Sequence, residues 1–511
     1  MDFQYQILVA PAVYPPFYKS IQLGYPKKLP SNIEDRGFKM EKMKSARYSQ
    51  GLRMFFEPKG VAVVGASRTP GKMGNTILRN IIKLGYAGQV FPVNPNASEI
   101  DGLKCYPSVA EIPEEVDLVV IAIPASLVLE VMKDCQKKGV KGVVVISSGF
   151  SESGEEGRMR QRELVRLARE AGIRVIGPNT TGVLNPEGGF STTFVDLQGV
   201  KPGGIGFIAQ TGMFAGMMFQ WIFSSQHFGL SKVIGLGNKA DVTDHDALDY
   251  LAEDESTKVV IMYLEGVKDG KRFFHSAARL VRRKPLVLIK GGKTQEGARA
   301  AQSHTGSLVG RDEIFDALCN QVGAIRVQDF EDLLDLGKTF SYQPLPRGNR
   351  LAIISLSGGA GVLSTDACLE SGLAPAHLRQ ETVARLNEKM PDWAQFRNNP
   401  LDIEPLSETV GREEAYRISL DAVLSDPGVD LALVIMSTIE SPRPNADYVI
   451  DVVRAHPDKP VAVCIIGEAT LYQQLFKVLE EAFVPVFVGV RRAVVSLAAL
   501  HRYRRTLDRL T

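Results

Sequence analysis

One of the seven histidines in this 511-residue chain, His304, lies in the segment AQSHTGSL among small and hydroxyl-bearing residues. Ser303, Thr305 and Ser307 can donate hydrogen bonds to an anion, and Gly306 permits a tight, exposed loop. No second histidine or cysteine lies at metal-ligand spacing, so the segment does not predict a metal site. The pattern favours acid–base or nucleophilic chemistry by His304 over packing of the imidazole in a core.

A carboxylate that could orient the imidazole ring ends the apolar run VVIMYLEG, in which Glu265 is the acid. Such a partner fixes the tautomer of a working histidine, although an acid at a strand end can equally be a solvated charge. The segment DVTDHD, residues 241–246, has the composition of a metal cluster. It is better explained as the cap of the following helix, DALDYLAE, because acids are favoured in a first turn. His245 is therefore not counted as a ligand.

The segment GASRTPGKMG, residues 65–74, joins an apolar strand to a helical pattern. Backbone amides and the helix dipole make such a junction an anion site, to which Lys72 adds a full charge; the competing interpretation is an ordinary strand-to-helix turn. It is not a Walker A loop, because five residues separate Gly65 from Gly71 and Met73 stands where Ser or Thr is required. Asn94-Pro95-Asn96 ends the next strand without an acid, so NAD binding through a ribose carboxylate is not indicated. A nucleotide with a phosphate-rich, ribose-phosphorylated end fits better.

From residue 60 onward, short apolar runs alternate with helical patterns, which predicts parallel sheets covered on both faces. Ligands of such sheets collect at the carboxyl ends of the strands. In the first unit the strands are followed by small and turn-forming residues, namely Gly65-Ala66-Ser67, Asn94-Pro95, Pro124-Ala125, Ser147-Ser148-Gly149 and Pro178-Asn179. This edge of the sheet is thus predicted to be open to a ligand.

The chain divides into three α/β units. The second opens with GGIGFIAQTGMFAG and the third, after the linker QPLPRGNR, with LAIISLSGGAGV; in both, an apolar strand leads through Thr-Gly or Ser-Gly into a helix rich in small residues. We expect α/β domains over residues 51–177, 178–341 and 347–511. Residues 1–50 lack periodicity and are expected to form a poorly ordered arm, with Met40 and Met43 as alternative start sites.

The composition of the chain argues against several kinds of binding partner and cellular compartment. The 60 basic and 58 acidic residues are interspersed, which argues against nucleic-acid binding. The longest apolar stretch, LVVIAIPASLVL, is too short to span a bilayer, and no basic cluster precedes QILVAPAV as it would in a signal peptide. Five widely spaced cysteines argue against a disulfide framework and a zinc site. These features predict a cytoplasmic protein that binds no membrane.

Several segments together resemble the α subunit, or α-like half, of the NDP-forming acyl-CoA synthetases, the superfamily of succinyl-CoA synthetase and ADP-forming acetyl-CoA synthetase. The matching segments run in the family's order from about residue 51 to the C-terminus: VGASRTPGKMGNTILRN, VNPN, DLVVIAIPA, SSGFSESGEEG, GPNTTGVLNP, AQTGMFAGMM, GLGNKADV, YLEGVKDG, KGGKTQEGARAAQSHTGSLVG and NNPLDI. The resemblance implies a Rossmann-like CoA-binding domain followed by two flavodoxin-like, succinyl-CoA synthetase-like domains.

The resemblance also implies the roles of the candidate residues. The strand-end turns would bind CoA, through Gly65, Ser67, Gly71, Lys72, Asn94, Pro124, Ser148 and Gly149. His304 would carry a phosphoryl group, with Glu265 as the acid beside it, and Gln210, Thr211, Gly212 and Gly306 would bind phosphate. In the family's reversible reaction, acyl-CoA and phosphate give an acyl phosphate, the histidine takes the phosphoryl group as the free acid leaves, and ADP receives it.

No segment of this sequence resembles the ATP-grasp domain of the family. In particular, nothing after residue 346 has the nucleotide-binding pattern of that domain. The expectation is therefore a hetero-oligomer in which a separate ATP-grasp β subunit supplies the nucleotide (ADP or ATP) and Mg²⁺, without which this chain is inactive. The substrates would be a small carboxylic acid or acyl-CoA and phosphate. The alternative is a CoA- or acyl-CoA-binding regulatory protein that keeps the fold without turnover; His304 and Glu265 favour the enzyme.

Overall fold

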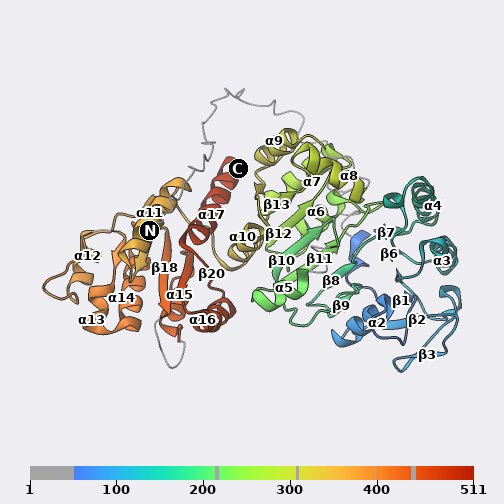
Figure 1. Cartoon of the computed structure of the whole chain (residues 1–511), viewed down its shortest axis with the longest axis horizontal. Coiled ribbons are helices and arrows are strands. Elements are labelled where there is room, and N and C mark those ends of the chain that lie inside the picture. The colour runs from blue at the N-terminus through green and yellow to red at the C-terminus, as the bar shows by residue number, and fades with distance from the viewer. Residues whose placement is uncertain (1–50, 213–217, 306–309, 398, 439–444, 511) are drawn as a thin grey trace, which may run out of the picture. The chain divides into compact units, whose positions relative to one another are not determined.

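The computed structural model describes residues 51–212, 218–305, 310–397, 399–438 and 445–510, with the side chains of 301–305 and 438 excepted (Figure 1). The predicted arm, residues 1–50, lies outside the described residues. Three parallel or largely parallel sheets follow one another along the chain, and an additional short ribbon pairs β3 (Glu99–Ile100) with β4 (Leu103–Lys104). None of the helices in the described part of the chain is both long and apolar enough to cross a membrane.

The first sheet has the strand order β2-β1-β5-β6-β7 and is entirely parallel. Its strands are β1 (Gly60–Val64), β2 (Gln89–Val93), β5 (Leu118–Ile121), β6 (Gly142–Val145) and β7 (Arg174–Ile176), all of them predicted from the continuous apolar runs. Alternate residues of β1 enter two separate cores: Val61 and Val63 pack with α2 (Met73–Lys83), and the intervening Ala62 packs with α3 (Ala125–Lys138) and α4 (Glu155–Ala171). Two short 3₁₀ helices, η1 (Val109–Glu111) and η2 (Ser151–Ser153), complete this unit.

The strand order of the first sheet reverses between β1 and β5, since the chain leaves β1 toward β2 and returns on the other side at β5. Adjacent loops diverge at such a switch point and leave a crevice at the carboxyl ends of the strands. The glycine loop 65–74 follows β1 and therefore lies at this crevice.

The second sheet has the order β14-β13-β12-β10-β11-β8-β9. Its parallel part comprises β10 (Pro202–Ala209), β11 (Leu230–Gly235), β12 (Val259–Leu264), β13 (Leu286–Lys290) and β14 (Ile325–Arg326). The sequence did not predict the two antiparallel strands at its edge, β8 (Val183–Asn185) and β9 (Phe190–Ser191), because both are very short. The helices are α5 (Met218–Ser225), α6 (Asp244–Glu253), α7 (Gly270–Val281), α8 (Gln295–Thr305), α9 (Asp312–Val322) and α10 (Phe330–Tyr342).

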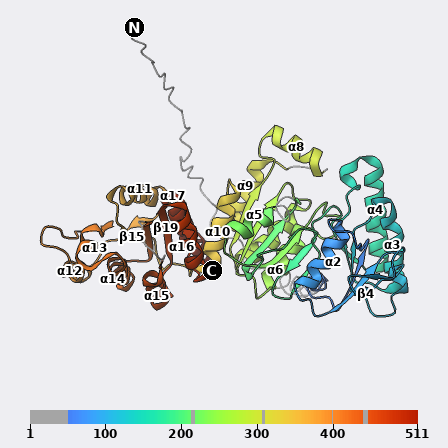
Figure 2. The same ribbon diagram turned by 60° about the horizontal axis from the view of Figure 1, so that its bottom comes forward.

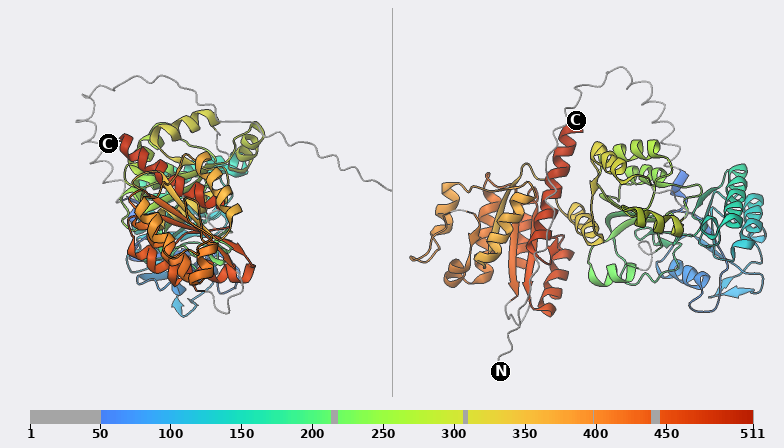
Figure 3. Two further views of the ribbon diagram at one scale, coloured as in Figure 1. Left: turned by 90° about the vertical axis from the view of Figure 1, so that its left-hand side faces the viewer. Right: turned by 45° about the horizontal axis from the view of Figure 1, so that its top comes forward.

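The third sheet has the order β16-β15-β18-β19-β20, with β17 also paired to β15. Its strands are β15 (Arg350–Ser355), β16 (Ala374–Pro375), β17 (Leu401–Asp402), β18 (Leu431–Thr438), β19 (Val461–Gly467) and β20 (Val486–Phe487). The helices are α11 (Gly358–Glu370), α12 (Gln380–Asn387), α13 (Glu404–Val410), α14 (Arg412–Ser425), α15 (Asp447–Ala455), α16 (Ala469–Glu481) and α17 (Val490–Leu510). Helix α17 packs along this sheet and against α10 and α11 (Figure 3).

Candidate functional site

The glycine loop 65–74 wraps over the start of α2. Gly65 has a φ of 89°. A Cβ atom on Gly74 would lie only 2.0 Å from the Gly65 carbonyl oxygen, so the backbone of α2 is in direct contact with the backbone of the loop. Lys72 is the N-cap of α2 and its side chain makes no capping hydrogen bond. No side chain thus caps the start of this helix, where the dipole favours an anion, and the exposed Lys72 lies beside it.

Asn94, at the end of β2, holds the glycine loop in place. Its Nδ2 donates to the carbonyl of Ala66 over 2.8 Å, and its Oδ1 accepts from the amide of Asn96 over 2.9 Å. Ser67 belongs to the same loop, where its Oγ accepts from the Thr69 amide over 3.1 Å. The structure thus gives Asn94 and Ser67 a role in shaping the loop.

A cavity of about 660 Å³ lies where the carboxyl edges of the first and second sheets meet. Pro124 and Ser148, predicted to bind the cofactor, line it together with Gln210, Thr211 and Gly212, predicted to bind phosphate. Met73, the residue after Lys72, also lines it, whereas Gly65, Ser67, Gly71, Lys72, Asn94 and Gly149 do not. The cavity therefore joins the end of the glycine loop to the start of the segment after β10.

Gly149 is positioned by a residue that the sequence did not single out, Glu152. Glu152 accepts from the amides of Gly149 over 2.6 Å and Phe150 over 3.1 Å, and from Nδ2 of the cavity residue Asn238 over 2.5 Å. Burial opposes ionisation of this acid, but the hydrogen bonds from Asn238 and the backbone outweigh burial and lower the pKa of Glu152. A charged Glu152 thus connects the turn after β6 with the turn after β11.

Gln210 follows β10 directly and is buried, with 2% of its surface exposed. Its Oε1 accepts from the amide of Glu265 over 2.9 Å, the amide of Gly266 over 3.3 Å and Nζ of Lys239 over 3.1 Å. Lys239 could not be predicted from the sequence. It follows a Gly-Asn pair at the end of a strand, and this local pattern is the same whether the lysine is buried or exposed to solvent.

Glu265 follows β12 and is buried beside Gln210. The Tyr263 hydroxyl donates to its Oε1 over 3.3 Å. Burial, together with the Glu265 carboxylate, raises the pKa of Tyr263, so this phenol stays protonated and remains a donor. The alternative of a freely solvated acid at the strand end does not apply to Glu265.

His304 lies in the last turn of α8, whose backbone is helical, whereas the glycines had suggested a loop at this position. The helix forms because QEGARAAQ is rich in good helix formers and the Thr294 Oγ1 accepts from the Gly297 amide over 3.0 Å at its start. Figure 2 shows α8 beyond α9 at the margin of the second unit. The side chain of His304 and all of Gly306 lie outside the described residues, so their assignments stay predictions.

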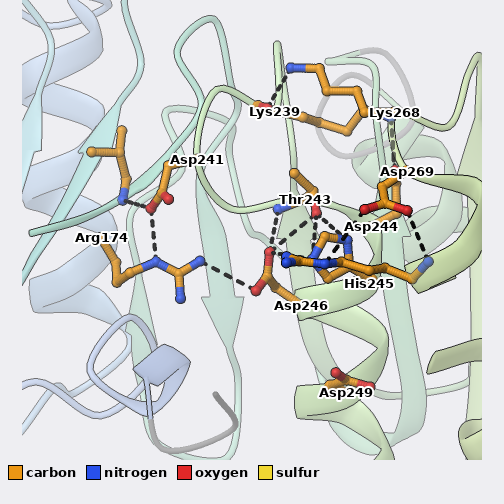
Figure 4. Close-up of polar contacts among 12 residues, drawn as sticks. Arg174, Lys239, Asp241, Thr243, Asp244, His245, Asp246, Asp249, Lys268 and Asp269 are labelled. Atoms are coloured by element: carbon orange, nitrogen blue, oxygen red, sulfur yellow. Dashed lines mark hydrogen bonds and ion pairs between the residues drawn. The ribbon is translucent and has the colours of Figure 1, made fainter. Parts of the chain in front are cut away.

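The segment 241–246 caps α6, as predicted (Figure 4). Asp246 Oδ2 accepts from the Thr243 amide over 2.9 Å, completing a capping box, and His245 Nδ1 lies 2.7 Å from the Thr243 hydroxyl. Asp241 instead binds Nε of Arg174 over 2.8 Å. Across the described residues, no cluster of three or more His, Cys, Asp or Glu side chains is arranged to hold a metal ion.

Two protein families match this chain. Residues 59–186 match a CoA binding domain, and residues 202–340 match the succinyl-CoA ligase like flavodoxin domain. The chain is 45% identical over 457 residues to acetate–CoA ligase (ADP-forming) II of Archaeoglobus fulgidus, covering 89% of this chain and 67% of that protein. It is 37% identical to the α subunit of acetate–CoA ligase (ADP-forming) I of Pyrococcus furiosus, covering 89% of this chain and 98% of that subunit.

Among solved structures, the dinucleotide-forming acetyl-coenzyme A synthetase 1 of Ca. Korarchaeum cryptofilum, in complex with phosphate and ADP, matches with a TM-score of 0.83. Its sequence is 36% identical, and the match covers 89% of this chain and 97% of that one. The likeness in fold therefore extends through all three sheets of the described chain.

Proposed function

Because this chain belongs to the NDP-forming acyl-CoA synthetases, the acid–thiol ligase family of succinyl-CoA synthetase, we propose that it is the CoA-binding, phosphohistidine-carrying subunit of an acid–CoA ligase. Residues 51–177 would bind CoA, 178–341 would carry the phosphohistidine, and 347–511 would form a further ligase domain. The observation that carries this proposal is the cavity of about 660 Å³ between the first two sheets. Two of the residues expected to bind CoA, Pro124 and Ser148, line it together with three residues expected to bind phosphate, Gln210, Thr211 and Gly212.

The proposed chemistry needs a thioester and a phosphate in one place. A phosphate oxygen attacks the thioester carbonyl carbon, the C–S bond breaks, and CoA leaves as the thiolate. An imidazole nitrogen of His304 then attacks phosphorus, and the carboxylic acid leaves as its carboxylate. Enzymes accelerate such phosphoryl transfers chiefly by positioning and by stabilising charge. Gln210, Thr211 and Gly212 line this cavity and would supply such stabilisation.

The phosphoryl group would pass from His304 to ADP on a separate ATP-grasp β subunit, which also holds Mg²⁺. Two relatives support this division of the reaction between two chains. The P. furiosus relative is a named α subunit of which 98% is matched, whereas only 67% of the A. fulgidus ligase is matched. The proposed assembly is therefore a hetero-oligomer, working in the cytoplasm on a small carboxylic acid.

CoA binding tests the first half of the proposal without any partner. Calorimetry on this chain is expected to show CoA binding that weakens as salt rises, because the α2 N-terminus and Lys72 would contact phosphate groups of CoA. Lys72→Gln should weaken binding roughly three- to tenfold, as expected for about 1 kcal/mol from an exposed charge. The matched control is Lys83→Gln, an exposed lysine in the last turn of the same helix. Tight binding of NADH with no response to CoA would refute the assignment.

Glu265→Gln is expected to slow phosphorylation of His304 by about 10- to 100-fold, the usual cost of losing a carboxylate that orients a working imidazole. The change keeps the volume and an oxygen for the Tyr263 hydroxyl, but removes the charge that favours the correct tautomer. The rate is measured by rapid-quench labelling of the complex with the partner subunit. Glu253→Gln, an exposed acid at the end of α6, serves as the control. An unchanged labelling rate in Glu265→Gln would remove this residue from the site.

A further inference from the structure

The inference concerns an acid that contacts both of the first two α/β units. We propose that Glu152 is a positioning residue that holds the turn after β6 against the part of the cavity wall that belongs to the second unit, so that a thioester bound by one unit meets a phosphate bound by the other. This rests on the proposed function, since it assumes that the two reactants bind on opposite sides of the cavity. Glu152 belongs to η2 of the first unit and is half-buried.

The two carboxylate oxygens of Glu152 are divided between the two units. Oε1 accepts from the amides of Gly149 over 2.6 Å and Phe150 over 3.1 Å, both in the turn after β6. Oε2 accepts from Nδ2 of Asn238 over 2.5 Å, in the turn after β11. Ser148, directly before Gly149, and Asn238 both line the cavity. One carboxylate thus joins two parts of the cavity wall that come from different sheets.

The side-chain amide of Asn238 is oriented by its partners. Its Nδ2 also donates to Oε1 of Gln161 over 3.0 Å, and its Oδ1 lies 3.5 Å from Nδ2 of Asn179. Exchanging the amide oxygen and nitrogen would set an acceptor against the oxygens of Glu152 and Gln161, so the NH₂ group must face the first unit. Nζ of Lys268 donates to the carbonyl of Asn238 over 3.0 Å and holds its backbone to the second unit. Asn238 is therefore a firm point against which Glu152 can align the first unit.

The turn after β11 has a second contact with the first unit, away from the cavity. Asp241 Oδ2 accepts from Nε of Arg174 over 2.8 Å and from the Val175 amide over 2.9 Å. Neither Asp241 nor Arg174 lines the cavity, whereas Asn238 does. The Arg174–Asp241 pair therefore docks the two units, and Glu152 sets the geometry at the cavity itself. This geometry matters because a displacement of about 1 Å between reacting groups can cost about 100-fold in rate.

The element that carries Glu152 also reaches the helix of the expected nucleophile. The 3₁₀ helix η2 contacts α8, whose last turn contains His304. Glu152 is the middle residue of η2, and its bonds to the amides of Gly149 and Phe150 hold η2 beside the turn after β6. One short segment therefore touches the turn expected to bind CoA, the cavity wall of the second unit and the helix of the proposed phosphohistidine.

The test exchanges donor and acceptor between Glu152 and Asn238 in the complex with the ATP-grasp subunit. Glu152→Gln keeps an oxygen for the Gly149 and Phe150 amides but sets an NH₂ group against Nδ2 of Asn238. It should lower kcat about 10- to 100-fold, while the Kd of this chain for CoA changes by less than about threefold. Asn238→Asp sets two carboxylates against each other and should lower kcat at least as far. Glu152→Gln/Asn238→Asp restores one donor and one acceptor and should recover kcat to within about fivefold of the wild type.

A second readout needs no turnover and no partner. Hydrogen–deuterium exchange on this chain should show faster exchange of the backbone amides of residues 237–240 in Glu152→Gln and in Asn238→Asp, by about threefold or more, because local opening becomes easier without the side-chain bond. In Glu152→Gln/Asn238→Asp the exchange should return toward the wild-type rate.

Two controls separate positioning from general stability. Glu155→Gln removes an exposed acid in the first turn of α4, whose partners Arg158 and Arg162 lie on the same helix. It should change neither kcat nor the exchange of residues 237–240. Asp241→Asn removes the charge opposite Arg174 and should lower the Tm, because an ion pair that loses one partner destabilises the fold, but it should leave kcat nearly unchanged.

The outcomes separate the two proposals. A wild-type complex without phosphate-dependent turnover of acyl-CoA would overturn the proposed function and the positioning role with it. An active complex in which Glu152→Gln leaves kcat unchanged, or in which the effects of the two changes add in the pair instead of cancelling, would overturn the positioning role alone. An equal fall of kcat in Asp241→Asn would also overturn it, by reducing Glu152 to one of several contacts that dock the units.

Discussion

His304→Asn is expected to abolish phosphoryl transfer, with turnover falling on the order of 10⁴-fold or more while CoA binding is retained. An asparagine amide nitrogen has no available lone pair, so the covalent step loses its nucleophile. CoA binding should persist, because the glycine loop and the strand-end turns belong to the first sheet and not to α8. The measurement is radiolabelling of the complex by ATP and Mg²⁺, with the label acid-labile and base-stable as expected for phosphohistidine.

The control for this change is His275→Asn, because His275 is an exposed histidine on α7 of the same unit. It should leave the label and the turnover unchanged. A label that persists in His304→Asn with the same acid lability would place the phosphoryl group on another histidine, and the role inferred from AQSHTGSL would be wrong.

Much of the fold could be predicted because its signals are local. Strands such as β1 and β6 are continuous runs of small and β-branched residues, which only a sheet buried on both faces accommodates. The cap of α6 could also be predicted, since Thr243 and Asp246 have the spacing of a capping box. The strands β8 and β9 could not be predicted, because segments of three and two residues are too short to show a hydrophobic pattern of their own. Their strand conformation is defined by the strands with which they pair.

Some residues of the site could likewise be predicted from local signals in the sequence, and others could not. The position of Pro124, Ser148 and Gln210 at the cavity could be predicted because they lie in the turns that follow β5, β6 and β10, and the topology of a parallel sheet gathers such turns at one edge. Lys239 and Glu152 could not, because their roles come from partners far along the chain: Lys239 Nζ binds Gln210, and Glu152 binds Asn238. Nothing in the neighbouring residues distinguishes these two hydrogen-bonded charges from ordinary surface charges.

The activity of this chain is expected to depend wholly on a second protein. Alone, it should form no thioester from acid, CoA and ATP, because the phosphohistidine proposed at residue 304 would need a nucleotide bound to the partner subunit. The glycine loop 65–74, whose helix has no side-chain cap, is assigned to CoA, and no residue of the described part of the chain is assigned to a nucleotide. Mixing the chain with an ATP-grasp subunit should produce turnover that needs CoA, ATP, Mg²⁺ and a carboxylic acid together, and a screen of acids identifies the substrate.

Controls in this reconstitution decide between a ligase and a protein that only binds CoA. The ATP-grasp subunit alone should be inactive, and adding His304→Asn in place of the wild-type chain should leave it inactive, so that activity requires this histidine and not merely an assembled complex. Turnover by the pure chain without a partner would show that its own domains hold a nucleotide site. CoA binding without turnover across ATP-grasp partners and acids would instead favour the regulatory alternative, because the fold and its CoA site would then be retained without phosphoryl transfer.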